Sequence, residues 1–176
     1  MNILGKKMRL TYNSPSALFT QNFGAVLGKV LKDRDLVALA GELGAGKTEL
    51  VKGIARGLEC SPNSLVASPT YILLREYEGR IRLYHFDFYR INSVRELEDI
   101  GYEEYFEQNG VCVVEWADKF AKIFPLSTLW IKLYVTGENE RMLEIESNSP
   151  EKWEKRLKSA IEEIRKISLD ERELEF

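Results

Sequence analysis

Several residue types that define whole classes of protein are scarce in this sequence. Only two cysteines occur among its 176 residues, Cys60 and Cys112, too few for the disulfide framework of a small secreted domain. Cys112 lies inside an apolar run, where a reduced, buried thiol is expected. No apolar run approaches the length of a membrane span, and residues 1–8, MNILGKKM, lack the hydrophobic core of a signal peptide. These absences together predict a cytoplasmic protein.

A strong excess of charge of either sign is also absent. The sequence has 25 basic and 28 acidic residues and a net charge of −3. This balance argues against a protein that grips nucleic acid alone, because such a protein needs a basic face to neutralise phosphates. The 44% of hydrophobic and 30% of charged residues are typical of a soluble globular protein. The length favours one domain over residues 1–176.

What the sequence does have is a phosphate-binding pattern at residues 41–48. The segment GELGAGKT fits G-x-x-x-x-G-K-[S/T]. Glycines let the backbone curl so that successive N–H groups point at phosphate oxygens. Lys47 would reach the β- and γ-phosphates of a nucleotide, and the Thr48 hydroxyl would bind Mg²⁺. The nucleotide-binding residues expected in and beside this loop are Gly41, Glu42, Leu43, Gly44, Ala45, Gly46, Lys47, Thr48 and Glu49.

The segments on either side have the order that such a loop requires. Residues 36–40, LVALA, form a short unbroken apolar run of the kind expected for a buried parallel strand. Residues 48–58, TELVKGIARGL, place apolar side chains at helical spacing, with Gly57 as a stop signal. The helix would direct the positive end of its dipole at the anion. Strand, loop and helix together predict a nucleotide phosphate site.

The remaining segments carry strand and helix patterns that predict an α/β fold, with a mixed, mostly parallel central sheet flanked by helices. The expected strands are residues 8–12, 71–77, 81–88, 111–115, 129–136 and 141–147, with 71–77 and 81–88 forming a β-hairpin. The expected helices are residues 14–31, 95–107 and a last helix from Ser149-Pro150, with a short amphipathic piece ending at Phe124. Ser14 and Pro15 are expected to be the N-cap and first residue of helix 14–31.

Carboxylates at strand ends are the natural candidates for the rest of a catalytic site. Mg²⁺ needs further oxygen ligands, and an attacking water must be oriented. The strand ends of an open α/β sheet line its ligand crevice. Glu115 ends the apolar strand VCVVE, so we expect it to be a second magnesium ligand. The next residue, Trp116, either lies near the nucleotide or packs beside the sheet.

Asp87 is a further candidate, within the segment YHFDFYR. Strand alternation would place residues 81, 83, 85 and 87 on one face and the aromatic residues 84, 86 and 88 on the other. A carboxylate on so apolar a strand needs a partner, for which Mg²⁺, its water shell and Arg90 are the candidates. His85 on the same face is either structural or catalytic. In SPTY, Thr70 either senses the γ-phosphate or belongs to a simple turn.

Four motifs in one order, GELGAGKT, SPTY, HFDFYR and VVEW, resemble the TsaE (YjeE) family, the small bacterial ATPases of tRNA threonylcarbamoyladenosine biosynthesis. The phosphate loop is widely shared, whereas HFDFYR and VVEW are far more specific. The resemblance implies a single P-loop NTPase-type domain that binds ATP or ADP with Mg²⁺ and hydrolyses ATP slowly. It also implies association with the TsaD and TsaB proteins, which modify adenosine 37 of tRNA, so that contact with tRNA is only indirect.

The resemblance also implies roles for individual residues. Lys47 would contact phosphates, and Thr48 and Glu115 would hold Mg²⁺. Thr70 and Asp87 would lie near the γ-phosphate or the metal, and Trp116 near the nucleotide. The catalytic residues expected on this basis are Lys47, Thr70, Asp87 and Glu115.

Two positions depart from the family pattern. Tyr71 stands where phenylalanine is common, and Glu49 stands where a serine or threonine often follows the loop. An acid at position 49 would repel the α-phosphate, unless it turns to solvent or pairs with Lys52. Two other functions remain open: a P-loop small-molecule kinase and a non-hydrolytic nucleotide-dependent scaffold. A GTPase is disfavoured because no Asn/Thr-Lys-x-Asp segment is present to read guanine.

Overall fold

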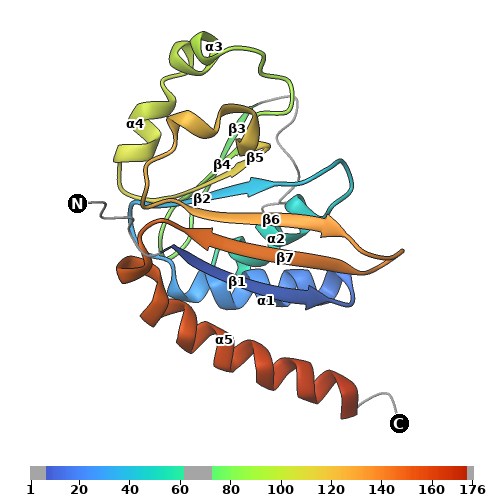
Figure 1. Cartoon of the computed structure of the whole chain (residues 1–176). Helices are drawn as coiled ribbons and strands as arrows, with labels where there is room; N and C mark the ends of the chain where they lie inside the picture. Colours follow the sequence, from blue (N-terminus) through green and yellow to red (C-terminus); the bar gives the residue numbers. More distant parts are fainter. Residues whose placement is uncertain (1–6, 62–72, 174–176) are drawn as a thin grey trace, which may run out of the picture.

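A mixed sheet forms the centre of the protein in the computed structural model, which describes residues 7–61 and 73–173, the last nine of these by their backbone alone (Figure 1). The described strands are β1 (Met8–Ser14), β2 (Asp35–Ala40), β3 (Leu74–Tyr77), β4 (Leu83–Asp87), β5 (Val111–Glu115), β6 (Leu129–Val135) and β7 (Arg141–Ser147). They are ordered β1-β7-β6-β2-β5-β4-β3. Strands β6, β2, β5 and β4 are mutually parallel, and the flanking pairs are antiparallel. The predicted α/β class and its mostly parallel sheet centre are confirmed.

Helices cover both faces of this sheet. They are α1 (Ala17–Val30), α2 (Lys47–Gly57), α3 (Val94–Asp99), α4 (Tyr102–Glu107), the 3₁₀ helix η1 (Ala117–Ile123) and α5 (Pro150–Glu173). In Figure 1, α1 and α2 lie behind the sheet with α5 below them, whereas α3 and α4 lie above it, toward the β4 and β5 side. No helix of the described segments is both long enough and apolar enough to cross a bilayer.

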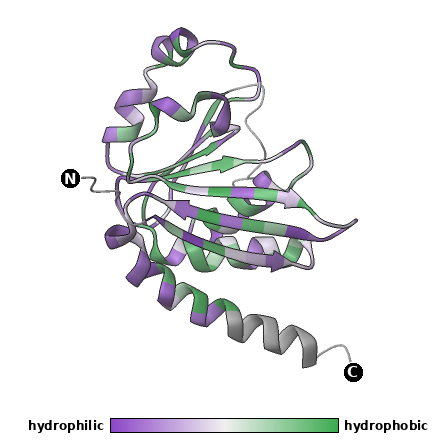
Figure 2. Ribbon diagram, viewed as in Figure 1, coloured by the Kyte–Doolittle hydropathy of each residue, from purple (hydrophilic) through white to green (hydrophobic). Residues whose placement is uncertain are grey.

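Strand β2 shows why the sheet is buried on both sides. Val37 and Leu39 pack into the core beneath α1, α2 and α5, while Leu36 and Ala38 pack into a second core with residues of α4 and η1. After the buried Asp35, the strand is apolar from Leu36 to Ala40 (Figure 2), as expected for a parallel strand covered on both faces. The loop that follows β2 therefore begins at the end of a strand that is buried on both faces.

Four glycines allow α1 and α2 to pack unusually closely. Gly24 and Gly28 of α1 face Gly53 and Gly57 of α2, and a Cβ added to any of the four would lie 2.1 to 2.5 Å from a backbone carbonyl oxygen of the opposite helix. Side chains at these positions would force the helices apart. The close contact therefore fixes the position of α2, which begins with Lys47 directly after the glycine loop.

The first half of α5 is joined to the end of α1 and the start of β2. Trp153 is fully buried, and its Nε1–H donates to the carbonyl oxygen of Ser127 at 2.8 Å. Arg156 donates to the carbonyl oxygen of Val30 at 2.7 Å and forms an ion pair with Asp35. The helix is thus part of the core structure.

Two predicted helix boundaries are wrong. The N-cap of α1 is Ser16, whose side chain accepts from the Phe19 N–H at 3.0 Å, whereas Ser14 ends β1. The helix expected over 95–107 is two short helices, because Gly101 adopts a left-handed conformation with φ of 68° between them. The other predicted strands and helices within the described residues are present, with ends shifted by a few residues.

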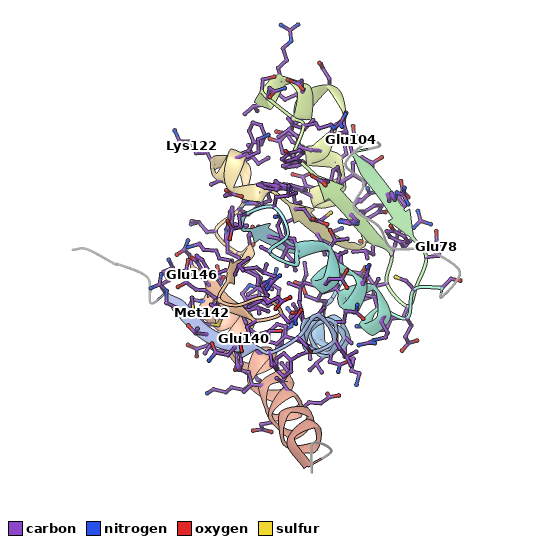
Figure 3. The ribbon with its side chains drawn as sticks, turned by 90° about the vertical axis from the view of Figure 1, so that its right-hand side faces the viewer. Glu78, Glu104, Lys122, Glu140, Met142 and Glu146 are labelled. Carbon is purple, nitrogen blue, oxygen red and sulfur yellow. The ribbon has the colours of Figure 1, made fainter. Side chains whose placement is uncertain are left out.

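Glu146 lies on the sheet near its β1 edge, within a group of charged side chains that we call the Glu146 cluster (Figure 3). Its carboxylate accepts from Lys7 Nζ at 3.1 Å, Arg9 Nη2 at 2.5 Å and Lys132 Nζ at 3.0 Å. Burial by itself raises the pKa of this carboxyl, but the hydrogen bonds from Lys132, Arg9 and Lys7 outweigh burial and lower it to about 2. The Glu146 cluster therefore stabilises the fold only where this carboxyl is ionised.

Candidate nucleotide site

The loop between β2 and α2 has a backbone that requires glycine. Gly41, Gly44 and Gly46 have φ values of 144°, 79° and 98°, a region that other residues rarely adopt. A Cβ on Gly41 would also lie 2.5 Å from the carbonyl oxygen of Leu133. Gly46 is the N-cap of α2 and makes no side-chain cap. The N–H groups of the first helical turn are therefore not capped from this position, and they form the positive end of an eleven-residue helix.

Lys47 is folded back over the loop. Its Nζ donates to the carbonyl oxygens of Gly41 at 2.7 Å and Glu42 at 2.9 Å, and lies 3.7 Å from the centre of the Trp116 ring. Burial lowers the pKa of the Lys47 ammonium below its ordinary value, against the opposing effect of nearby carboxylates such as Glu115. The positively charged ammonium of Lys47 is thus held at the inner side of the glycine loop.

Glu115 reaches α2 because β5 is parallel to β2 and pairs with it directly. The Thr48 hydroxyl lies 2.9 Å from Oε1 and 3.1 Å from Oε2 of Glu115. His85 Nε2 lies 2.9 Å from the same Oε1. Glu115 is only 2% exposed and His85 is fully buried. A hydroxyl and a carboxylate therefore meet at the start of the helix that follows the loop, where they could share a cation.

Asp87 and two aromatic residues complete a pocket of about 400 Å³. Asp87 is buried, and its Oδ1 accepts from the Tyr89 N–H at 2.8 Å. The rings of Tyr89 and Trp116 are 4.9 Å apart. Trp116 has a φ of 59°, an unusual conformation for an aromatic residue and one that often marks a functional site. The pocket is lined by Leu43, Gly44, Gly46, Lys47, Thr48, Glu49, Asp87, Tyr89, Glu115 and Trp116.

This arrangement fits a Mg²⁺–nucleotide better than a metal held by protein alone. Among the described residues, no group of three or more histidine, cysteine, aspartate or glutamate side chains is placed to hold a metal ion. Mg²⁺ bound with nucleotides typically uses one or two protein oxygens and completes its shell with phosphates and water. The pair formed by Thr48 and Glu115, beside a phosphate-type loop, matches that donor set.

The sequence model of a family described as "Threonylcarbamoyl adenosine biosynthesis protein TsaE" matches residues 14–143. The chain belongs to the TsaE family. A Treponema pallidum protein named tRNA threonylcarbamoyladenosine biosynthesis protein TsaE is 41% identical over 132 residues, which cover 75% of this chain and 96% of that protein. A Bacillus subtilis protein of the same name is 43% identical over 111 residues, or 62% of this chain and 68% of that protein.

One solved structure has the same fold as this chain. The crystal structure of Bacillus subtilis YdiB superposes with a TM-score of 0.69 at 28% sequence identity. The superposition covers 93% of this chain and 98% of YdiB. The fold of this TsaE-family chain is therefore shared along nearly its whole length, beyond the segment that the family model matches.

The structure gathers most of the residues expected from sequence. Lys47, Thr48, Asp87, Glu115 and Trp116 line one pocket. Thr70 and Tyr71 lie outside the described residues. Three of the expected loop residues do not line this pocket: the carbonyl oxygens of Gly41 and Glu42 accept from Lys47, and Ala45 is fully buried.

Glu49 pairs with Lys52, which is one of the two arrangements expected to reduce its repulsion of the α-phosphate. Lys52 Nζ donates to Oε1 at 2.6 Å, and Gln21 Nε2 donates to Oε2 at 2.5 Å. Burial by itself raises the pKa of the Glu49 carboxyl, but the hydrogen bonds from Lys52 and Gln21 outweigh burial and lower it. The negative charge is therefore partly neutralised within α2 and α1, although Glu49 still lines the pocket.

Two contributors to the pocket region were missed. Tyr89, which is aromatic and follows Asp87 by two residues, lines the pocket but is not among the residues expected from sequence. Lys119 of η1 donates to the carbonyl oxygens of Phe88, Tyr89 and Ile91 at 3.1, 2.5 and 2.6 Å. No sequence pattern identifies such a contact, because its acceptors are main-chain atoms about thirty residues away.

Proposed function

We propose that this protein is a Mg²⁺-dependent ATPase that acts with TsaD and TsaB in the threonylcarbamoyl modification of adenosine 37 in tRNA. The names of its relatives and its family support the pathway. The single observation that carries nucleotide hydrolysis is the meeting of Thr48 and Glu115, 2.9 Å apart, beside the glycine loop and Lys47. We also propose that residues 1–176 form one ATPase domain and that the protein is cytoplasmic.

In this proposal, the loop and α2 bind the phosphates of ATP or ADP. Main-chain N–H groups of the glycine loop and the first turn of α2 would donate to phosphate oxygens. Lys47 would exchange its contacts with the carbonyl oxygens of Gly41 and Glu42 for contacts with the β- and γ-phosphates. Trp116 would form one wall beside the Lys47 ammonium, which it already contacts.

Thr48 and Glu115 would hold Mg²⁺, whose charge would neutralise the phosphate oxygens during hydrolysis. Asp87 would orient the attacking water, because it lines the same pocket and its carboxylate is fixed by the N–H of Tyr89. Thr70 remains a proposed sensor of the γ-phosphate. Slow turnover by the protein alone is expected, with TsaD and TsaB raising it.

The test is ATP hydrolysis by the purified protein, alone and with TsaD and TsaB, with Lys47→Ala and Glu115→Gln as site variants. We expect weak Mg²⁺-dependent release of phosphate that rises with both partners and falls by at least about 100-fold in either variant. A pull-down of TsaD and TsaB in ATP, in ADP and without nucleotide would show which nucleotide state of this protein binds the two partners.

Two results would contradict the proposal. Transfer of the γ-phosphate to a small acceptor by the protein alone would indicate a kinase. Nucleotide-dependent recruitment of TsaD and TsaB without any turnover would indicate a scaffold, and would leave the binding roles of Lys47 and Thr48 intact while removing the catalytic role of Asp87.

A further inference from the structure

His85 is the one histidine of the sequence, and it lies fully buried in the middle of β4. Its strand pairs in parallel with β5, where Asp87 is opposite Glu115 and His85 is opposite Val113. His85 and Glu115 therefore lie on the same face of neighbouring strands, and Nε2 of the ring is 2.9 Å from Oε1 of Glu115. Water is excluded from this contact, since the Glu115 side chain is only 3% exposed.

The hydrogen-bonding network assigns the proton of the ring. A carboxylate oxygen only accepts, so Nε2 carries the proton and donates it to Glu115. The other ring nitrogen, Nδ1, is buried and has no hydrogen-bond partner within the part of the chain that the structure describes. An unpaired lone pair in that position costs less than an unpaired N–H. The geometry therefore makes the Nε2–H of His85 the donor to Glu115.

We infer that His85 is a positioning residue that fixes the carboxylate of Glu115 for metal binding at Thr48. This inference rests on the proposed function, because it concerns the same magnesium ligands. Oε1 of Glu115 accepts from both His85 and Thr48 at 2.9 Å, and Oε2 lies 3.1 Å from Thr48. The donor on His85 holds Oε1 on the β4 side, so the carboxylate cannot rotate away from the Thr48 hydroxyl.

Among the side chains that the structure describes, removing this donor would leave only the Thr48 hydroxyl on the buried carboxylate. Groups that orient a metal ligand typically contribute about 10- to 100-fold to metal affinity. The phosphate contacts proposed for the glycine loop and Lys47 do not involve His85, which does not line the pocket. Loss of the His85 donor should therefore weaken metal-dependent nucleotide binding and leave metal-free nucleotide binding unchanged. A merely structural role in the core would weaken both to the same degree.

The experiment compares His85→Gln with His85→Asn. The amide nitrogen of glutamine can take the place of Nε2, whereas the shorter asparagine reaches only the place of Nδ1. Both variants bury an amide, so they are matched in their cost to the fold. Thr128→Val is a control for loss of a buried polar atom elsewhere, because the Thr128 hydroxyl is buried and without a hydrogen-bond partner among the described residues.

Calorimetry would give the affinity for ADP in Mg²⁺ and in EDTA, and electron paramagnetic resonance would count bound Mn²⁺ on the ADP complex. We expect His85→Asn to lose about 10-fold or more of the Mg²⁺-dependent gain in affinity and to bind Mn²⁺ correspondingly more weakly. His85→Gln and Thr128→Val should stay close to the unmodified protein. All four proteins should bind ADP equally in EDTA.

Equal metal dependence in His85→Asn and His85→Gln would overturn the inference, as would a loss of ADP affinity that is the same with and without Mg²⁺. Failure of the proposed function has a different signature. In that case the unmodified protein would itself show no effect of Mg²⁺ on ADP binding and no bound Mn²⁺.

Discussion

Substitution of Gly53 by alanine tests whether the close packing of α1 and α2 sets the position of the phosphate loop. A Cβ at Gly53 would lie 2.1 Å from the carbonyl oxygen and 2.8 Å from the carbonyl carbon of Gln21. The first distance is 1.3 Å shorter than the 3.4 Å at which ordinary contact begins. Because the contacting atoms are main-chain atoms, no side-chain rotation relieves the overlap, and the two helices must separate.

The expected effect on stability combines two terms of opposite sign. Overpacking of a core typically costs about 1–3 kcal/mol, and this site should lie near the upper end because both partners are backbone. Replacing glycine by alanine inside a helix contributes about 1 kcal/mol in the other direction. We therefore expect Gly53→Ala to lower the free energy of unfolding by about 2 kcal/mol, or about 1 M in the urea midpoint.

Urea denaturation followed by circular dichroism measures this midpoint, and ADP affinity measures the effect on the site. Since α2 begins at Lys47 and Thr48, its displacement should weaken ADP binding under conditions where the variant is fully folded. Lys158→Ala on the exposed side of α5 is the control, and it should change stability by less than about 0.5 kcal/mol. A midpoint for Gly53→Ala that is unchanged or higher would refute the reasoning, since that is the result for an unpacked helical glycine.

Three further predictions follow from contacts described above. The charge of Glu49 is partly neutralised by Lys52, so Glu49→Thr should change ADP affinity by no more than about threefold, the value of a partly exposed ion pair. Tightening by tenfold or more in calorimetry would show that the acid repels the phosphates. Glu146 has a folded-state pKa lowered from 4.5 to about 2, so its contribution is complete above pH 4.5 and is lost as pH falls toward 2. Acid titrations of the unfolding midpoint should therefore fall less steeply in Glu146→Gln, by an amount on the order of 1 kcal/mol because the basic partners are partly solvated, and parallel titration curves would contradict this. Lys119→Met removes three hydrogen bonds to carbonyl oxygens and should speed amide exchange at residues 88–91; protection equal to that of the unmodified protein would show that other contacts hold this segment.

Local patterns in the sequence predicted those parts of the fold that local physics decides. Apolar runs identified β2 and β5, and strand alternation placed His85 and Asp87 on the face opposite the aromatic residues of β4. The packing of β4 agrees with this alternation, because Leu83 packs in the core beneath α1 and α2, while Tyr84 and Phe86 pack in the other core. Helix 95–107 was predicted without its break, because a glycine inside a helical pattern does not reveal its φ.

Contacts between distant segments could not be predicted in the same way. Whether His85 is structural or functional remained open from the sequence, since its partner Glu115 is thirty residues away and is brought near only by the parallel pairing of β4 and β5. The order of the strands likewise depends on long-range pairing. The spacing of Gly24 with Gly28, and of Gly53 with Gly57, is a signal of close helix packing that is visible in the sequence, although it does not say which helices meet.

Helix α5 completes the core from outside the segment that the family model matches. The family match covers residues 14–143, yet Trp153, Leu157 and Ala160 of α5 are buried in the same core as α1 and α2. The core that holds α1 and α2 in place therefore extends beyond the segment that the family model matches. Residues 14–143 alone would leave apolar side chains of this core exposed to water, because α5 covers them in the whole chain.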